Sequence, residues 1–393
     1  MLKSYKTEIN PTQQQIQKIN QSIGICRYLY NFYIAKNKEL YELYKEGKIE
    51  KNNSFMSAND FDKYINHEIK TQKEFQWISN CGAKSRKKSI CNAETAFKNF
   101  FKGKSDFPKF KKKNKQKVKL YFPKNNKTDW KIERHRINIP TLKWVRLKEF
   151  GYIPSNADII SGYVSKQADK YYVSVTIEIE NTKVIKEKSE PIGIDLGLKD
   201  FAICSNGLTK KNINKTSKVK KLEKKLKREQ RKLSRKYESL KKRSKNKKGE
   251  ATRQNISKQV IKVQRLHRNL RDIRTDYINK TVSEIVEQNP SSITIEDLNV
   301  KGMMKNKHLS KAVAQQKFYE FRVKLENKCK QKDIELRVVD RWYPSSKLCH
   351  ECGTIKSDLK LSDREYVCEC GYHSDRDYNA SLNLRDAKTY KVA

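Results

Sequence analysis

The chain has 393 residues, which is long enough for two or three domains and excludes a single small module. It carries 88 Lys and Arg against 45 Asp and Glu, and a net charge of +43 is typical of a protein that binds a polyanion. Nucleic acid is favoured over a membrane surface, because no apolar stretch approaches about 18 residues and the start, MLKSYKTEINPTQQQ, lacks a signal-peptide core.

The first hundred residues predict a strand followed by a helical block. Residues 1–10 alternate like a strand, and Asn10-Pro11-Thr12 is a turn signal that opens a helix. A helical pattern then continues to about Phe101, with polar breaks near residues 52–54. Its aromatic residues recur at helical spacing, which favours a core role over a base-stacking surface. We interpret residues 13–106 as a helical recognition domain.

From Phe107 to Asn181 the hydrophobic period changes to two. The runs VKLYF, RINIP, WVRL and YYVSVTIEIE predict short strands of a small oligonucleotide-binding-like β-barrel, formed by residues 1–12 and 107–188 and carrying the helical block as an insertion. The entry FPKFKKKNKQK interleaves Phe107 and Phe110 with lysines. A solvated turn and a phosphate-tracking groove explain it equally well. In the second case Lys109, Lys111 and Lys112 contact nucleic acid.

The stretch PIGIDLGLKDFAIC, residues 191–204, places a carboxylate inside an apolar strand. Its pattern predicts two strands joined by a turn at Gly197 to Asp200, with Asp195 inside the first. An unpaired carboxylate there costs several kcal/mol, and a divalent metal ion is one of the few partners that offset this cost. GIDLG is not a dinucleotide fingerprint, because it lacks the third glycine and the following helix.

The segment from Lys210 to Glu250 holds 20 basic and 4 acidic residues. Leucines at helical spacing, then a polar break near Lys247 to Glu250 and a second apolar stripe, predict an antiparallel helical hairpin over residues 215–288. Such a run of charged residues is usually a solvated helix face. An excess of positive charge this one-sided, however, would repel itself unless an anionic partner neutralised it. We therefore favour nucleic-acid contact, with candidates Arg231, Arg235, Lys236 and Arg274.

Two further acids occur in a context like that of Asp195. Glu296 ends the apolar strand of SSITIEDLNV, with Asp297 as a less favoured substitute because it should face the opposite side. HSDRDYNASLNL predicts a turn into a helix capped by Asp375 or Asp377. Asp195, Glu296 and one of these aspartates can converge on two Mg²⁺ ions in a mixed sheet of the ribonuclease H type. Taken singly, each acid also fits a cap, a satisfied buried acid or an exposed charge.

Four of the nine cysteines lie together in LCHECG and VCECG, each pair followed by a glycine that lets the backbone turn. Four thiolates in two knuckles predict a closed structural Zn²⁺ site, so His350 and His373 are not needed as ligands. Disulfides are the alternative, disfavoured in the cytoplasm that the missing signal peptide implies. The zinc-ribbon insertion spans 343–373. The predicted ligands are Cys349, Cys352, Cys368 and Cys370.

These motifs, in order, resemble the TnpB proteins of insertion sequences, which are relatives of the compact type V CRISPR effectors. The likeness runs through GIDLGLKDFAICSNG, LSRKYESLKKRSKN, RTDYINK, ITIEDLNVKGM, YPSSKLCHECG and CECGYHSDRDYNASLNL, and less closely through FPKFKKKN and IPTLKWVRL. It covers most of the chain beyond about residue 100. Asn279 stands where the family often has His.

The resemblance implies an RNA-guided DNA endonuclease with a RuvC-like nuclease domain over residues 189–393. Asp195, Glu296 and Asp377 match the catalytic acids, and Asp377 is preferred over Asp375 because it precedes x-Asn-Ala. A guide RNA would read the double-stranded DNA target by base pairing while the protein reads a short flanking motif. Barrel and helical domains would hold the guide and that motif. Cleavage of both strands would leave 5′-phosphates and 3′-hydroxyls. Lys347 joins the predicted nucleic-acid contacts.

Several alternatives stay open. A compact CRISPR effector is not distinguished from TnpB by these motifs. A single-strand transposase requires an HxH motif and a tyrosine nucleophile, and none of the six histidines forms HxH. A non-catalytic regulator or an unguided nuclease would also be basic. We expect a monomer in the prokaryotic cytoplasm or nucleoid, without membrane association.

Overall fold

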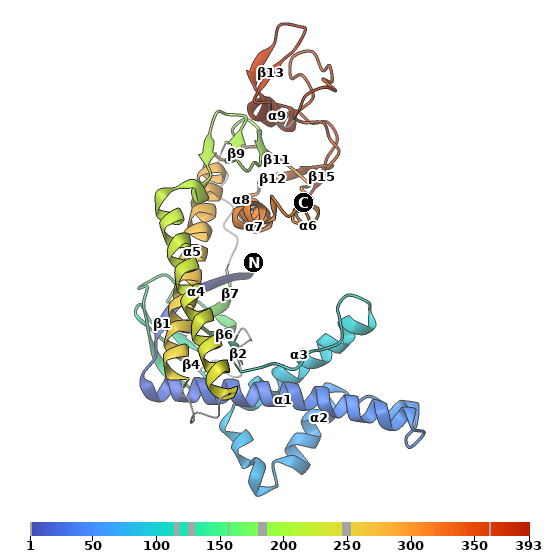
Figure 1. Cartoon of the computed structure of the whole chain (residues 1–393), viewed down its shortest axis with the longest axis vertical. Coiled ribbons are helices and arrows are strands. Elements are labelled where there is room, and N and C mark those ends of the chain that lie inside the picture. Colours follow the sequence, from blue (N-terminus) through green and yellow to red (C-terminus); the bar gives the residue numbers. More distant parts are fainter. Residues whose placement is uncertain are drawn as a thin grey trace. The chain divides into compact units, whose positions relative to one another are not determined.

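The computed structural model describes residues 2–113, 118–124, 130–155, 157–179, 187–245, 253–360 and 363–393 (Figure 1). The chain divides into two compact units, Met1–Glu180 and Asn181–Ala393. The predicted hairpin turn at Lys247 to Glu250 lies outside the described residues. The predicted multidomain α+β organisation with a mixed sheet is confirmed.

The N-terminal unit contains an antiparallel sheet in the order β2-β6-β7-β1-β5-β4-β3. Strand β1 lies between β7 and β5, so the start of the chain completes a sheet whose other strands come more than a hundred residues later. The strands are β1 Leu2–Asn10, β2 Val118–Pro123, β3 Lys131–Ile132, β4 Arg136–Ile139, β5 Lys143–Leu147, β6 Ile159–Gln167 and β7 Lys170–Glu178.

Helices occupy the chain between β1 and β2. Helix α1 begins after Thr12, whose hydroxyl accepts a hydrogen bond from the Gln15 backbone N–H while the Gln15 side chain caps Thr12 in return. The helical elements are α1 Gln13–Lys45, α2 Ala58–Tyr64 and α3 Ala83–Phe101, with a π-helical turn at Ile65–Ile69 and 3₁₀ segments at Lys51–Asn53 and Lys73–Asn80. The helical block predicted from the sequence is thus present.

One hydrophobic core joins these helices to the sheet. Leu29 and Tyr33 of α1 belong to the same buried cluster as Val173 and Val175 of β7. Strand β6 was not among the predicted strands, because Ser and Gly interrupt its apolar pattern. Gly162 has a packing reason: a Cβ there would lie 2.4 Å from the Trp130 ring.

The C-terminal unit contains a mixed sheet in the order β10-β9-β8-β11-β12-β15. Strands β8, β11 and β12 are parallel, with Ile194 paired to Ile295, so their carboxyl ends share one edge. The other neighbours in this sheet are antiparallel. The strands are β8 Ile192–Asp195, β9 Asp200–Cys204, β10 Thr209–Lys211, β11 Ser292–Glu296, β12 Glu335–Val339 and β15 Lys391–Val392.

The helices of the C-terminal unit are α4 Ser217–Lys245, α5 Gln254–Glu287, α6 Val300–Met303, α7 Ser310–Gln316, α8 Phe318–Lys332 and α9 Arg376–Arg385, with a 3₁₀ turn at Ile213–Lys215 and a hairpin of β13 Glu365–Val367 and β14 His373–Asp375. Helices α5 and α8 pack on the mixed sheet through a second buried cluster, which includes Ile278 and Val282 of α5 and Phe321 of α8. Helix α9 packs against β8 at Gly193, where an added Cβ would lie 2.0 Å from the Ser381 carbonyl oxygen.

Candidate functional site

Two of the predicted acids lie at the shared carboxyl edge of the parallel strands. Asp195 is the last residue of β8, not an interior residue as predicted, and Glu296 is the last residue of β11. Because Ile194 and Ile295 pair in register, the residues that follow them leave the sheet at the same level. Both side chains are half-buried. The sheet therefore brings two carboxylates from distant segments to one place.

The third acid comes from the start of α9. Asp375 caps this helix, accepting hydrogen bonds from the backbone N–H groups of Asp377 at 2.9 Å and Tyr378 at 3.1 Å. The Asp377 carboxylate instead pairs with Arg376 at 2.7 Å and lies 3.6 Å from the Arg364 guanidinium. Asp375 thus has a structural role as the helix cap, whereas the Asp377 carboxylate is held by two arginines.

The charges around Asp195 affect its protonation. Burial first, and then the charges of Glu296 and Asp377, raise the pKa of Asp195 to about 8, while the charge of Arg376 opposes them. Burial also raises the pKa of Glu296, and a hydrogen bond from Ser345 lowers it. Three oxygen-donor side chains in one partly buried place form the kind of ligand set that Mg²⁺ accepts.

The loop after β12 supports Glu296. The Ser345 hydroxyl donates a hydrogen bond to Glu296 Oε1. The Asn383 amide of α9 in turn donates to the carbonyl oxygens of Ser345 at 2.8 Å and Leu348 at 2.7 Å. The helix that carries Asp377 therefore also fixes the segment that positions Glu296.

Asp297 lies outside this group. Its carboxylate pairs with the guanidinium groups of Arg322 at 2.5 Å and Arg341 at 2.9 Å, and the bond from Arg322 contributes most to the lowered pKa of Asp297. Its carboxylate is therefore used in a surface ion-pair network.

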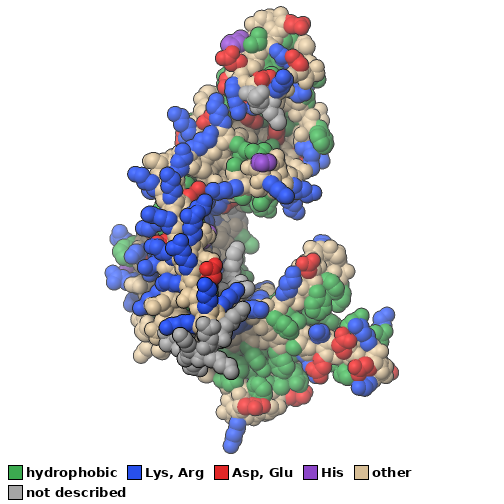
Figure 2. Space-filling model, in the orientation of Figure 1, with side chains coloured by type: hydrophobic (Ala, Val, Ile, Leu, Met, Phe, Trp, Pro, Cys, Tyr) green, Lys and Arg blue, Asp and Glu red, His purple; other side chains and the backbone are tan. Residues whose placement is uncertain are grey.

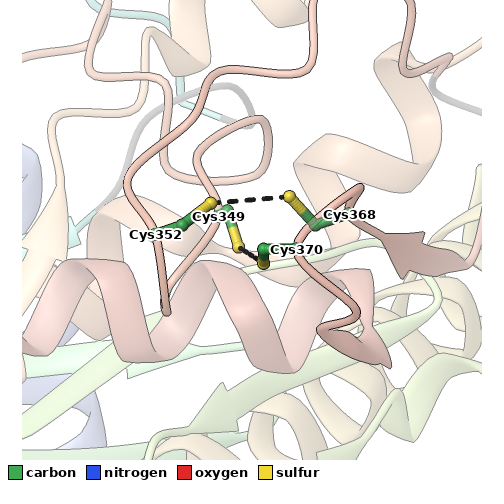
Figure 3. Close-up of side chains that lie close together, drawn as sticks. All are labelled: Cys349, Cys352, Cys368 and Cys370. Atoms are coloured by element: carbon green, nitrogen blue, oxygen red, sulfur yellow. Dashed lines mark hydrogen bonds between the residues drawn. The ribbon is translucent and has the colours of Figure 1, made fainter.

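The four predicted zinc ligands do converge. The sulfur atoms of Cys349, Cys352, Cys368 and Cys370 all lie within 4.8 Å of one another (Figure 3). Sulfur separations of 3.7 Å for Cys349 to Cys370 and 3.6 Å for Cys352 to Cys368 match the edge of a tetrahedron with Zn–S bonds of about 2.3 Å, which is about 3.8 Å. The residues therefore fit a zinc ion.

The turns of both knuckles rely on glycine. The N–H of Gly353 donates to the Cys349 carbonyl and that of Gly371 to the Cys368 carbonyl, each at 3.0 Å, and both glycines have positive φ. His350 and His373 are outside the sulfur cluster. His350 Nδ1 lies 3.7 Å from Asp386, and His373 Nε2 lies 3.5 Å from Glu365.

The predicted basic surface covers the hairpin of α4 and α5, which run side by side (Figure 1), and Figure 2 shows Lys and Arg crowded along it. Arg231 and Arg235 are exposed on α4, and Lys236 reaches the Asn255 carbonyl at 3.3 Å. Arg274 is engaged within the protein: it bonds Glu223 and Asn214, each at 2.7 Å, and is largely buried. Lys347 donates to the Ser357 carbonyl at 2.8 Å.

The three lysines of the FPKFKKK segment differ in their surroundings. Lys109 pairs with Asp106 at 3.2 Å, and Lys112 is exposed. Lys111 lies over the Tyr30 ring, 3.4 Å from its centroid, and burial lowers the pKa of its ammonium group. Their contact with nucleic acid stays a prediction.

Three family profiles match the chain. "Probable transposase" of the IS605 OrfB type covers residues 174–307, "Cas12f1-like, TNB domain" covers 318–384, and an IS605 OrfB "Helix-turn-helix domain" covers 1–46. Domains of the IS605 OrfB (TnpB) family therefore match residues 1–46 and 174–307. The family resemblance seen in the sequence is confirmed. In the structure the segment matched by the third profile is β1 followed by the single helix α1.

Curated relatives align with nearly the whole chain. A Streptomyces pristinaespiralis protein named "Putative RNA-guided DNA endonuclease" is 27% identical over 97% of this chain and 88% of its own length. The Escherichia coli K12 protein "Putative RNA-guided DNA endonuclease InsQ" is 28% identical over 98% of this chain and 91% of its own.

Among solved structures, a Cas12f1–sgRNA–target DNA complex aligns with 97% of this chain and 84% of its own, with a TM-score of 0.56 and 16% identity. The chain therefore shares its fold with the Cas12f1 protein of that complex. No helix in the described part of the chain has the length and apolar character needed to cross a bilayer.

Sequence reasoning missed the residues that support the acids. Ser345, Asn383, Arg364 and Arg376 contact the site or hold it in place, yet each is an ordinary polar residue in a loop or short helix. The one available signal was proximity in sequence to the cysteine pairs and to Asp377.

Proposed function

We propose that this chain is an RNA-guided DNA endonuclease that hydrolyses phosphodiester bonds in double-stranded DNA beside a short flanking motif. The observation that carries the proposal is that Asp195 and Glu296 end two adjacent parallel strands at one edge of the mixed sheet, and that α9, which carries Asp377, packs against both strands. Similarity to known proteins supports it, because relatives named as RNA-guided DNA endonucleases align with almost the entire chain.

The three acids would hold two Mg²⁺ ions. When bound, such ions polarise the phosphodiester and stabilise both the attacking and the leaving oxygen. The chain's own residues prepare the ligands: Ser345 orients the Glu296 carboxylate, and Arg376 and Arg364 hold that of Asp377. A scissile phosphate placed at this edge would lie beside these arginines.

We also propose the types and boundaries of the domains. The parallel core β8-β11-β12 with antiparallel β9 and the helix α9 supports a ribonuclease H-like, RuvC-type nuclease domain over residues 189–393, with a zinc-ribbon insertion at 343–373 and the basic hairpin at 215–288. The antiparallel sheet of the N-terminal unit supports a β-barrel of residues 1–12 and 107–188 around the helical domain 13–106. Zn²⁺ in the cysteine cluster would be structural.

The proposed partners are a guide RNA and the target DNA. The net charge is +43, and much of it lies on the hairpin. This suits a protein that binds the phosphate backbone of a guide RNA, while the RNA bases recognise the target by pairing. The predicted contacts Lys109, Lys111, Lys112, Arg231, Arg235, Lys236 and Lys347 belong to this proposal, whereas Arg274 is engaged inside the protein with Glu223 and Asn214. We further propose a monomer acting in the prokaryotic cytoplasm or nucleoid.

A compact type V CRISPR effector is the second candidate, favoured by the Cas12f1 fold. Sequencing the RNA that copurifies with protein expressed from its native flanking DNA separates the two. A single structured RNA that runs from the 3′ region of the gene into the flanking sequence supports the TnpB function. Repeat-spacer RNA would establish the CRISPR function, and absence of a defined RNA would contradict both.

The metal assignment has its own test. Asp195→Ala should abolish Mg²⁺-dependent cleavage and leave RNA binding within a few fold, because a ligand is lost and the basic surface is unchanged. Asp358→Ala, at an exposed aspartate of the same unit, is the matched control and should cleave normally. Persistent cleavage by Asp195→Ala would refute the metal site. Cleavage that needs no RNA would indicate an unguided nuclease.

A further inference from the structure

A pocket of about 840 Å³ opens on the solvent face of β1, β5 and β4 in the N-terminal unit. Strand alternation explains its lining, because Val145 and Leu147 of β5 point into the core while Trp144 and Arg146 point outward. Its walls carry three arginines, a histidine and two aromatic rings: Arg134, Arg136, Arg146, His135, Trp144 and Phe150.

The pocket holds more positive charge than the described residues neutralise. Arg146 lies directly opposite Arg136 on β4, and like charges in such cross-strand positions destabilise a sheet. Arg136 is paired with Glu133, through Nε to Oε2 at 2.5 Å and Nη2 to Oε1 at 3.0 Å. Within the described part of the chain, Arg134 and Arg146 form no ion pair. An anion bound between them would remove the repulsion.

The two aromatic rings of the pocket can offer a flat surface to a planar ligand. The Gln15 amide donates to the carbonyl oxygens of Leu142 and Trp144, each at 2.9 Å, which ties β5 to the start of α1. Arg136 covers one face of the Trp144 ring, 4.6 Å from its centroid. Phe150 is 56% exposed, and its ring lies edge-on to the His135 ring, with 6.4 Å between the ring centroids. A phenylalanine so exposed beside unpaired arginines offers a stacking surface.

We propose that this pocket binds one unpaired nucleotide of the guide RNA, with its base stacked on Phe150 and its phosphate bound by Arg134 and Arg146. Stacking on aromatic rings with arginine contacts is how proteins recognise unpaired RNA bases, whereas a duplex backbone requires charge alone. Asn10, at the rim opposite Arg146, can hydrogen-bond a ribose 2′-hydroxyl. The pocket volume lies in the range of small-ligand sites, about 300–1,000 Å³. The inference rests on the proposed RNA-guided function.

Photo-cross-linking to the full chain tests the site. Single-stranded RNA containing 4-thiouridine is added to RNA-free protein, and the RNA that copurifies is cross-linked in parallel. After nuclease and protease digestion, mass spectrometry should find a nucleotide on the peptide that contains Trp144 or Phe150. A DNA probe of the same sequence should cross-link there several-fold less. Equal or stronger DNA cross-linking, or no cross-link at this peptide, would overturn the assignment.

Variants measure the contribution of the pocket. Phe150→Ala should weaken binding of the copurifying RNA about tenfold, as expected for loss of one base–aromatic stack, and Phe150→Trp should restore it. Tyr319→Ala, at an exposed ring of α8, is the control and should bind normally. Unchanged affinity in both Phe150→Ala and Arg146→Gln would refute the proposal. Guided cleavage is scored separately, so a cross-link without cleavage would reject only the proposed function.

Discussion

The Ser345 hydroxyl donates a hydrogen bond to the Glu296 carboxylate, so the loop that leads into the cysteine cluster also holds one of the three acids. Ser345 is buried, and its carbonyl oxygen is bound by Asn383 of α9. The zinc-ribbon region and the proposed catalytic edge are therefore mechanically connected.

Ser345→Ala should slow cleavage about tenfold or more, because a hydrogen bond to a charged group contributes roughly 1.5–3 kcal/mol. The loss should appear in the turnover rate under saturating RNA and DNA. Ser291→Ala, at an exposed serine beside β11, should cleave at the wild-type rate. A Ser345→Ala enzyme with full activity would show that Glu296 needs no support from this loop.

Gly193→Ala should destabilise the C-terminal unit and impair cleavage. The new Cβ would lie 2.0 Å from the Ser381 carbonyl and 2.4 Å from the Arg385 nitrogen, so α9 must move away from β8 and take Asp377 with it. Overpacking of this kind costs about 1–3 kcal/mol, measurable as a lower melting temperature. Gly24→Ala, in an open position within α1, should be neutral or stabilising. Equal melting temperatures for wild type and Gly193→Ala would contradict the close packing.

Zinc removal should loosen the region around Cys349 to Asp377. One zinc per chain is expected by elemental analysis, and a chelator should increase protease cleavage near β13 and β14 and reduce DNA cleavage, because β14 runs directly into α9. Restoring zinc should reverse both effects. The structural assignment fails if zinc-depleted protein keeps its protease resistance and activity.

Basic residues of the hairpin should separate into two classes. Replacing Arg231, Arg235 and Lys236 with Gln should reduce the slope of log affinity against log salt for RNA by about 2, because up to three phosphate contacts are lost. Arg274→Ala should instead lower the melting temperature, since it breaks the bonds to Glu223 and Asn214. The reverse outcome, a large salt effect for Arg274 alone, would assign its contact to RNA.

The ion pairs of Asp297 should make the stability of the folded protein depend on pH. Hydrogen bonds from Arg322 and Arg341 lower the pKa of Asp297 in the folded protein. A carboxylate whose pKa is lower in the folded than in the unfolded protein stabilises the fold at pH values above its unfolded pKa, which is near 4. This stabilisation is lost as the pH falls through the folded pKa. Asp297→Asn should therefore melt lower than wild type at pH 7, with the difference narrowing below pH 4. A difference that does not depend on pH would point to lost packing.

The sequence alone determined the features that depend on local pattern or composition. Apolar periodicity predicted β8, β11 and both hairpin helices, and the spacing of four cysteines with their glycines predicted a metal cluster. Strand β6 escaped prediction, because Gly162 is required by the Trp130 ring, a contact that no local pattern reveals.

Only the tertiary structure decided which side chains meet. It gave Asp375 the role of helix cap and paired Asp377 with Arg376 and Arg364. It also engaged Arg274 in an internal ion pair and built the arginine-rich pocket from β1, β4 and β5. Gln15 and Trp144, which that pocket needs in contact, are 129 residues apart. Local pattern sets whether a segment is a strand or a helix, whereas sheet order and packing between distant segments set which charges and rings become neighbours.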